Sequence, residues 1–173
     1  MLTLSGGALF TAGVRYSGRF EYLPGPQRLP LFKPPWGSLV AIDMSTGEHR
    51  WRAAVGSGDL PPIRHLKIPD RLGMPNRSFA LVTKSVLLVV QSGYQNSPRP
   101  APFAPGRRVF DLTNFEPKLY VHDKASGRLL AEIPLPANAS GAPMTYMAGG
   151  KQYVAFPVGG ANIPEELIAL ALP

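Results

Sequence analysis

The stretch Ala41-Ile42-Asp43-Met44-Ser45-Thr46-Gly47-Glu48-His49-Arg50-Trp51 decides the fold of this chain. It predicts a strand, a tight turn and a second strand, because an Asp side chain can bond N–H groups of a turn and Gly47 can adopt a positive φ. An altered copy, Val121-His122-Asp123-Lys124-Ala125-Ser126-Gly127-Arg128-Leu129-Leu130-Ala131, follows eighty positions later. A repeated β-hairpin of this kind predicts a propeller or a similar radial array.

The two copies of the hairpin differ most at their last position. Trp51 is large enough to fill the wedge between neighbouring blades, and its indole N–H needs one partner. Ala131 stands at the same place in the second copy. That interface must be packed by another residue, or it is weaker by about 3–5 kcal/mol. We expect the marked positions of the first hairpin to build the blade and to do no chemistry: Asp43, Thr46, Gly47 and Trp51. In the copy, Asp123, Ser126 and Gly127 keep the turn.

The composition is that of a globular chain. Of 173 residues, 45% are hydrophobic and 17% are charged, and the 20 Pro and 18 Gly are spread between apolar runs. This pattern favours short strands with many turns over a low-complexity tail. The absence of Cys excludes a disulfide scaffold, a thiolate metal site and a cysteine nucleophile.

Neither a membrane span nor a nucleic-acid partner is predicted. No run approaches the roughly 18 apolar residues that a span needs. The first residues lack the basic and apolar regions of a signal peptide, so the signal of an exported protein would lie upstream. The net charge is +7, but the basic residues are scattered and the densest cluster is Arg107-Arg108. A solvated surface is the better interpretation of this charge.

Three segments share one internal plan and predict a single partial propeller over residues 1–173. Short β-branched and aromatic runs separated by Gly pairs indicate four-stranded antiparallel blades over 1–56 and 77–136, and an incomplete blade over 142–173. Segments 14–37 and 93–117 are predicted to be long loops inside the first two blades. The expected strands are Leu2–Ser5, Ala8–Gly13, Ser38–Asp43, His49–Val55, Phe79–Lys84, Val86–Ser92, Lys118–Asp123, Leu129–Leu135, Pro143–Ala148, Lys151–Val158 and Leu167–Leu172.

The inventory of catalytic residues is short. His49, His65 and His122 show no metal-ligand spacing, and we expect each to be a surface or turn residue. The carboxylate pairs Asp111 with Glu116 and Glu165 with Glu166 are explained by loop solvation. There is no nucleophile elbow, phosphate loop or dinucleotide fingerprint. The sequence therefore predicts no catalytic and no metal-binding residue within the chain.

Further strings carry a family resemblance. The motif Ala41-x-Asp43-x-x-Thr46-Gly47-x-x-x-Trp51 resembles the tryptophan-docking motif of pyrroloquinoline-quinone (PQQ) dependent dehydrogenases, which are eight-bladed propellers. Other strings resemble the C-terminal part of the glucose and quinate dehydrogenase branch of that family, in family order. They are Pro34-Pro35-Trp36-Gly37-Ser38-Leu39, Leu72-Gly73-Met74-Pro75-Asn76, Gly141-Ala142-Pro143-Met144-Thr145-Tyr146-Met147, Gly150-Lys151-Gln152-Tyr153-Val154, Gly159-Gly160 and Leu167-Ile168-Ala169-Leu170-Ala171-Leu172-Pro173.

The resemblance implies that the chain is the last two and two-thirds blades of an eight-bladed quinoprotein propeller. It implies PQQ and calcium as cofactors of the full-length parent, an alcohol or sugar substrate, a quinone electron acceptor and a periplasmic location. The family's catalytic and metal-binding residues belong to earlier blades, so none is carried over, and the chain alone is expected to be inactive. The implied partners are the remaining blades, or another chain that pairs at the open sheet edges.

One residue is a candidate for cofactor binding. Asn76 enters an inner strand of the second blade, where family members place polar groups that face the funnel; a turn-capping Asn after Pro75 is the alternative. After this string the family usually has Leu-Gly-Gly, whereas this chain has Arg77-Ser78-Phe79. An Arg and a Phe would crowd the space that glycines leave open, or point elsewhere.

Two other functions stay open. A non-catalytic propeller scaffold would tolerate the lost glycines and the missing second Trp. A self-associating interaction module would cover its own open edges by pairing with further copies.

Overall fold

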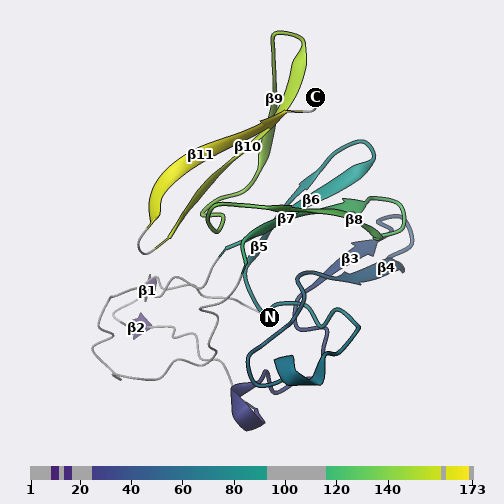
Figure 1. Cartoon of the computed structure of the whole chain (residues 1–173), viewed down its shortest axis with the longest axis vertical. Coiled ribbons are helices and arrows are strands. Elements are labelled where there is room, and N and C mark those ends of the chain that lie inside the picture. Colours follow the sequence, from purple (N-terminus) through teal and green to yellow (C-terminus); the bar gives the residue numbers. More distant parts are fainter. Residues whose placement is uncertain (1–8, 12–13, 17–24, 93–115, 161–162, 172–173) are drawn as a thin grey trace.

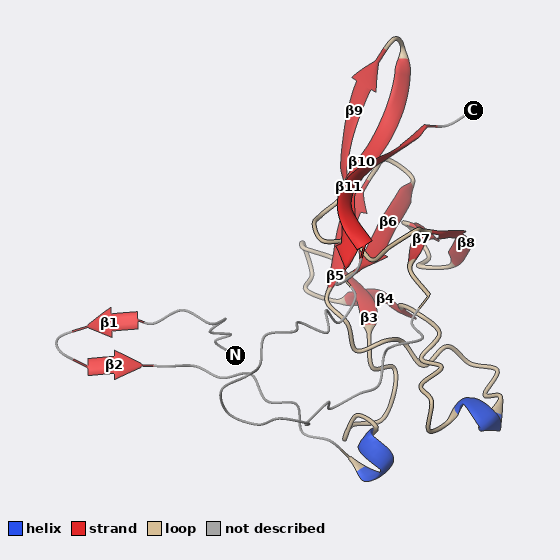
Figure 2. Cartoon of the chain, turned by 60° about the vertical axis from the view of Figure 1, so that its left-hand side comes forward, coloured by secondary structure: helices blue, strands red, loops and turns tan. Residues whose placement is uncertain are grey.

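The structure is a computed structural model that describes residues 9–11, 14–16, 25–92, 116–160 and 163–171. As predicted, the fold is all-β: eleven strands are accompanied by only two 3-10 turns, η1 (Pro26–Arg28) and η2 (Arg64–Leu66), in these residues. The sheets that contain β3–β4, β5–β8 and β9–β11 follow one another in the sequence and lie next to one another in space, whereas β1 and β2 lie apart from them (Figures 1 and 2). None of the described helices has the length and apolar content that crossing a membrane requires.

The middle sheet contains all four predicted strands. β5 (Ser78–Val82), β6 (Val86–Gln91), β7 (Lys118–Asp123) and β8 (Leu129–Pro134) pair antiparallel in the order β5-β6-β7-β8. From Leu87 to Gln91 every residue of β6 is buried, because this sheet has a neighbour on each face. The apolar run of β6 therefore belongs to a strand that is covered on both sides.

The first segment differs from its prediction. β3 (Ser38–Ile42) and β4 (His49–Ala54) form a two-stranded sheet, while β1 (Leu9–Thr11) and β2 (Val14–Tyr16) form a separate one. Four strands in one sheet are thus not found among the described residues, and β2 lies inside the segment 14–37 that was expected to be a loop. Thr11 pairs with Val14, and such a two-residue connection favours local hairpin pairing. The expected strand Leu2–Ser5 lies outside the described residues, as does nearly all of the expected loop 93–117.

The third sheet has three strands, as predicted. β9 (Met144–Ala148), β10 (Lys151–Gly160) and β11 (Ile163–Ala171) pair in the order β11-β10-β9. Gly149 and Gly150, both with positive φ, form the turn between β9 and β10. The last run of the chain is a strand, as predicted, but β11 begins four residues before the expected Leu167.

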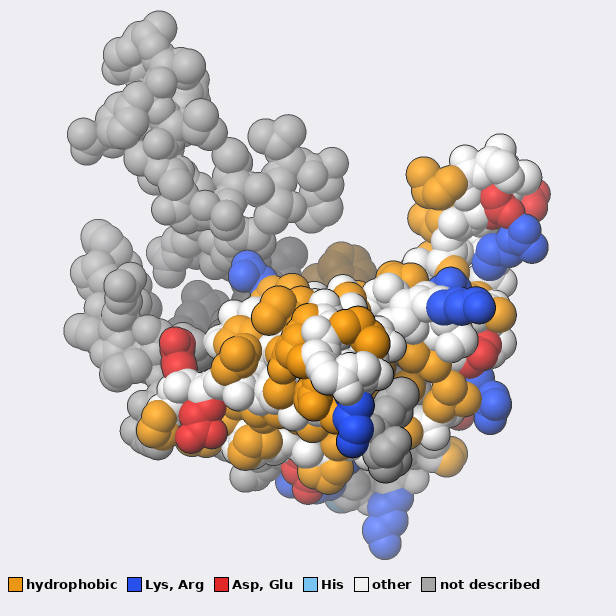
Figure 3. Space-filling model, turned by 90° about the horizontal axis from the view of Figure 1, so that it is seen from above, with side chains coloured by type: hydrophobic (Ala, Val, Ile, Leu, Met, Phe, Trp, Pro, Cys, Tyr) orange, Lys and Arg blue, Asp and Glu red, His pale blue; other side chains and the backbone are white. Residues whose placement is uncertain are grey.

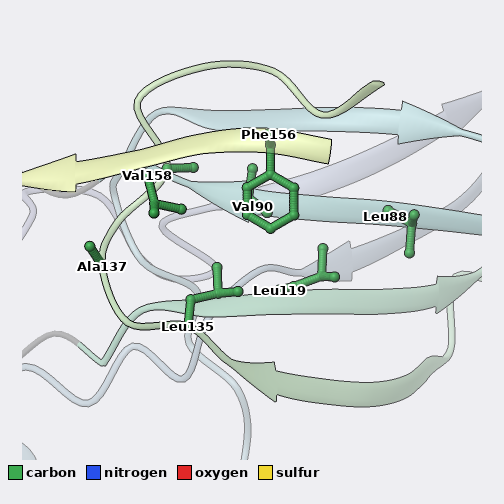
Figure 4. Close-up of a cluster of buried hydrophobic side chains, with 8 residues drawn as sticks. Leu88, Val90, Leu119, Leu135, Ala137, Phe156 and Val158 are labelled. Carbon is green, nitrogen blue, oxygen red and sulfur yellow. The ribbon is translucent and has the colours of Figure 1, made fainter. Parts of the chain in front are cut away.

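Two apolar clusters join three of the four sheets: the first sheet, β3–β4, the second, β5–β8, and the third, β9–β11. One contains Leu39 and Trp51 of the first sheet together with buried residues of the second, among them Val89 and Tyr120. The other contains Leu88, Val90 and Leu119 of the second sheet together with Phe156 and Val158 of the third. Figure 4 shows Phe156 at the centre of this second cluster. The core thus lies between sheets, and each of these three sheets is stabilised by its neighbour.

Candidate functional site

The joint between the first and second sheets is built by the predicted tryptophan. The indole Nε1–H of Trp51 donates to the backbone oxygen of Lys124 at 3.1 Å. The ring lies against Gly127, where an added Cβ would come within 2.5 Å of its Cε3. Asp123 holds this turn by accepting bonds from the backbone N–H and hydroxyl of Ser126, at 2.8 and 2.7 Å. The prediction that Trp51 fills the wedge between sheets and finds one partner is confirmed.

The joint between the second and third sheets has a different construction. Ala131 on β8 contributes no aromatic ring there. Phe156 of β10, which is 0% exposed, packs against Leu88, Val90 and Leu119 instead. Phe156 therefore packs the middle of this interface, while Ala131 itself is exposed.

The connection from β4 to β5, residues 55–77, carries the candidate cofactor residue. Its neck is closed by backbone bonds: Met74 N–H donates to Val55 O at 2.7 Å, and Leu72 N–H donates to Ser57 O at 2.9 Å. Asn76 follows this neck and donates its backbone N–H to Met74 O at 2.8 Å. Its side-chain Nδ2 and Oδ1 are both buried, and neither has a hydrogen-bond partner within the described structure. A buried amide in this state is unstable unless a ligand or water satisfies it.

A second buried amide lies beside this connection and was missed by sequence reasoning. Gln91 ends β6 and is 2% exposed. Its Nε2–H donates to the Ser78 hydroxyl at 3.2 Å, while its Oε1 has no partner in the described residues. A Cβ on Gly56 would lie 3.1 Å from that oxygen. Gln91 thus contacts both the start of the connection and the strand that follows Asn76. The only sign of this buried amide in the sequence is the position of Gln91 at the end of an apolar run.

The substituted string after Asn76 does not crowd it. Arg77 is exposed, and Phe79 is partly buried and packs against the cluster between the second and third sheets. The structure therefore favours the alternative in which Arg77 and Phe79 point away from the space beside Asn76 over the alternative in which they crowd it.

A charge network ties the same connection to the outer strand of the second sheet. Arg71 forms a salt bridge with Glu132, and Lys118 Nζ lies 3.1 Å from the second oxygen of Glu132 and 3.4 Å from Glu116. Partial burial opposes ionisation of Glu132, but hydrogen bonds from Lys118 and Arg71 outweigh it and lower its pKa. The hydrogen bond to Glu132 raises the pKa of Lys118. Burial raises the pKa of Tyr120 on the neighbouring strand. Spacing in the sequence gave no hint of this network, since Arg71 and Glu132 are 61 positions apart.

The connection also forms an open pocket of about 500 Å³, lined by residues between Ser57 and Leu72. Its charged side chains include Asp59 and Arg64, which pair with each other at 2.9 Å. This internal pairing leaves the pocket without a concentrated charge of either sign.

The histidines do not assemble into a site. His49 and His65 are exposed, as predicted. The prediction for His122 as a surface or turn residue is wrong: it is 1% exposed on β7. Its Nδ1 lies 3.0 Å from the carbonyl oxygen of Gly127, so the ring packs beneath the turn that receives Trp51. Within the described residues, no three His, Asp or Glu side chains come together as metal ligands would.

Among the described residues, Asn76 offers polar atoms that PQQ could use, and no set of calcium ligands is gathered. The unpartnered amide of Asn76 can both donate to and accept from a polar group such as a quinone oxygen or a carboxylate. Calcium needs six to eight oxygen ligands, several of them carboxylates, and the described part of the chain gathers no such set.

Comparison with known proteins agrees with this fold and motif. The family model "PQQ: Glucose/ethanol/alcohol dehydrogenase, beta-propeller domain" matches residues 5–154. Quinoprotein glucose dehydrogenase A of Acinetobacter calcoaceticus is 29% identical over 168 residues, covering 93% of this chain and 18% of that protein. The probable quinate dehydrogenase (quinone) of Xanthomonas campestris pv. juglandis is 30% identical, covering 96% of this chain and 20% of that protein.

A third relative is a dehydrogenase with a different name. The glycerol dehydrogenase large subunit of Gluconobacter thailandicus is 27% identical, covering 82% of this chain and 17% of that protein. The chain thus spans about a fifth of the length of these curated relatives. No solved structure matches it significantly.

Proposed function

This chain belongs to the β-propeller family of PQQ-dependent glucose, ethanol and alcohol dehydrogenases, and on that premise we propose that it supplies the last two and two-thirds blades of a quinoprotein dehydrogenase. The blades would correspond to residues 1–56, 77–136 and 142–173. The whole enzyme would oxidise an alcohol or sugar and pass the electrons to a quinone in the periplasm. The chain alone would be inactive, because the catalytic and calcium-binding residues would lie in other blades.

Asn76 is the residue of this chain that we propose to contact the cofactor. When bound, PQQ supplies the two-electron acceptor and calcium polarises its quinone oxygens. The observation that carries this assignment is the buried, unpartnered amide of Asn76, two residues before the start of β5. PQQ has carbonyl and carboxylate oxygens that can accept a hydrogen bond from Nδ2 of Asn76. Such a bond would give this buried nitrogen a partner.

The uncovered surfaces of the chain support its role as part of a larger propeller. On the face of the third sheet that points away from the second, Met144, Tyr146 and Leu167 are exposed. Seen from above, apolar side chains gather over the middle of the described surface (Figure 3). Monomeric proteins rarely leave large apolar patches open. We propose that the remaining blades, or another chain that pairs at the free edges, cover these surfaces.

The test begins with the reading frame upstream of the Met1 codon. If earlier blades precede it, the complete product should reduce an artificial electron acceptor with an alcohol or aldose, and only when PQQ and calcium are supplied. Asn76→Ala should weaken PQQ binding about five- to fiftyfold, the effect of losing hydrogen bonds to a buried polar group. Asn138→Ala is the matched control, because Asn138 also has a buried unpartnered oxygen but lies on the connection to the third sheet.

Two outcomes would overturn the proposal. A reading frame without further blades, together with no PQQ-induced absorbance change in the purified protein with calcium, would exclude the dehydrogenase. A folded protein of that kind would instead support the scaffold. Equal PQQ affinities for Asn76→Ala and the unsubstituted protein would remove Asn76 from the site and leave the enzyme class standing.

A further inference from the structure

Residues 71–76, near the end of the connection between β4 and β5, make contacts with both the first and the second sheet; we call them the exit segment. Two backbone bonds join the exit segment to residues that flank the first sheet. Leu72 O accepts from Trp36 N–H at 2.7 Å, and Met74 N–H donates at 2.7 Å to the residue that follows β4. Asn76 is the last residue of the exit segment. The position of the candidate cofactor residue therefore depends on how this segment is held.

The contact of the exit segment with the second sheet is a salt bridge. Arg71 is the only charged residue of the segment, and its guanidinium binds one carboxylate oxygen of Glu132 on β8. The two side chains are 38% and 24% exposed, respectively, so solvent screens this pair only in part. Backbone bonds thus hold the exit segment on one side, and a single ion pair holds it on the other.

Glu132 is itself fixed by its own sheet. Its second carboxylate oxygen lies 3.1 Å from Lys118 Nζ on the neighbouring strand β7, and its backbone lies opposite Tyr120 of the same strand. An isolated surface ion pair contributes little to stability, whereas a network with ordered partners contributes more. Because Lys118 already orders the carboxylate, the other oxygen of Glu132 is in place to bind Arg71.

We propose that Glu132 is a positioning residue for Asn76. By binding Arg71, the carboxylate holds the exit segment against the second sheet and so fixes the buried amide at the end of that segment. This role rests on the contact between Asn76 and PQQ proposed above. Without the salt bridge, the exit segment would keep its backbone bonds to the first sheet and lose its ion pair with the sheet that Asn76 precedes. A binding group works only while its supporting contacts hold it in place, so the loss should weaken cofactor binding.

Two other ion pairs provide matched controls. Arg64 pairs with Asp59 at 2.9 Å inside the same connection, so Arg64→Gln removes a salt bridge that joins the connection only to itself. Glu116 lies 3.4 Å from Lys118, so Glu116→Gln removes a neighbour of the network that makes no salt bridge with the connection. Both control side chains are exposed.

The first measurement is nuclear magnetic resonance of the purified 173-residue chain. The side-chain NH₂ signal of Asn76 is identified by its absence from Asn76→Ala. Glu132→Gln and Arg71→Gln should each shift this signal and speed hydrogen exchange of Leu72 N–H about two- to fivefold. The double variant should do no more than either single one, because both remove the same salt bridge. Arg71→Lys, which keeps the charge, should restore part of the protection.

The Asn76 signal separates positioning from a general loss of stability. The Asn76 amide has no hydrogen-bond partner among the described residues, so a shift caused by Glu132→Gln reports movement of the exit segment and not a broken bond to Asn76. Arg64→Gln and Glu116→Gln should leave both the signal and the exchange rate unchanged. The substituted side chains are all exposed or partly exposed, and unchanged circular dichroism would show that the variants fold.

The second measurement is PQQ titration of the complete protein with calcium. Glu132→Gln should weaken PQQ binding about two- to fivefold, which is less than the loss for Asn76→Ala, while Arg64→Gln should leave it unchanged. The positioning role is overturned if Glu132→Gln leaves the Asn76 signal and the Leu72 exchange rate as they are, or if Arg64→Gln changes them as much. It is also overturned if Glu132→Gln keeps full PQQ affinity while Asn76→Ala loses it.

Failure of the proposed function gives a different result. If Asn76→Ala keeps full PQQ affinity, Asn76 does not bind the cofactor, and the functional assignment of that residue is wrong. The resonance and exchange data do not depend on PQQ, so they still decide whether Glu132 holds the exit segment.

Discussion

The two joints between sheets hold the same kind of interface together in different ways. At the first joint, the indole of Trp51 lies on the turn of the next sheet and donates one hydrogen bond to Lys124 O. At the second, Phe156 is buried among aliphatic side chains in the middle of the interface. The comparison shows that two neighbouring sheets can be joined without the docking motif: the second joint has Ala131 in place of the tryptophan and is packed in its middle by Phe156.

The largest effect is expected at the second joint. Phe156→Ala should lower the free energy of unfolding by about 3–5 kcal/mol, because a fully buried aromatic ring leaves a cavity that the sheets fill only in part. Urea denaturation of the purified chain measures this. Tyr146→Ala is the control, since Tyr146 stacks on Tyr153 with a centroid separation of 5.1 Å but lies on the uncovered face. An equal loss for both variants would contradict a joint centred on Phe156.

The first joint should respond less. Trp51 is only partly buried, so Trp51→Ala should cost about 2–3 kcal/mol, below the range for a fully buried aromatic residue. Trp51→Phe keeps a ring and loses the bond to Lys124 O, which should cost about 1 kcal/mol. Trp36→Phe is matched to it, because that indole donates only to Phe32 within its own segment. If Trp51→Ala is as costly as Phe156→Ala, the ranking of the two joints is wrong.

A pair of glycines isolates the docking contact itself. Gly47 and Gly127 hold the same turn position with φ of 76° and 73°. Each Gly→Ala substitution forces a left-handed residue, which costs about 1–2 kcal/mol. A Cβ on Gly47 meets nothing within 4 Å, whereas one on Gly127 would lie 2.5 Å from the Trp51 ring. Gly127→Ala should therefore exceed Gly47→Ala by about 1 kcal/mol in thermal or urea unfolding. That excess should vanish in a Trp51→Ala background.

Local patterns were sufficient to predict much of this fold. Every strand of the second and third sheets follows a short apolar run bounded by a turn signal, and the turn at Gly149-Gly150 was readable from its glycines. Trp51 could be assigned to a joint between sheets because its large ring can fill the wedge between blades and its single indole N–H needs only one partner. The β2 strand was missed because its three residues pair only with β1, and three residues are too few to show a period.

The features that define the site depend on contacts between distant segments. Asn76 was found through a family string, but the sequence could not show that its amide is buried and unpartnered. Gln91 and His122 are polar residues in or beside apolar runs, and their burial depends on the sheets that cover both faces of β6 and β7. The Arg71–Glu132–Lys118 network forms only after the connection folds back on the second sheet. In the sequence, Phe156 resembles any other strand residue, because its burial depends on contacts with the second sheet.

The smallest expected effect separates the two turns by pH. Hydrogen bonds from the hydroxyl and N–H of Ser45, with a further one from Arg50, lower the pKa of Asp43 to about 2. The hydrogen bonds from Ser126 also lower the pKa of Asp123, but there the arginine, Arg128, acts only through its charge. Because the folded pKa of Asp43 lies below its usual value of 3.8, its contribution to stability is present above about pH 4 and is lost as the pH falls toward 2.

Nuclear magnetic resonance titration of the two carboxyl groups can test this difference between the turns. Arg50→Gln should raise the pKa of Asp43 and leave that of Asp123 unchanged, because Arg50 bonds Asp43 alone. Asp43→Asn should remove the part of the pH dependence of unfolding that arises from the first turn. If Arg50→Gln moves both pKa values equally, the arginine acts through the charge of the whole protein and the two turns are electrostatically equivalent. If it moves only that of Asp43, the first turn has a local ion pair that its copy lacks, just as the first joint has an indole that the second joint lacks.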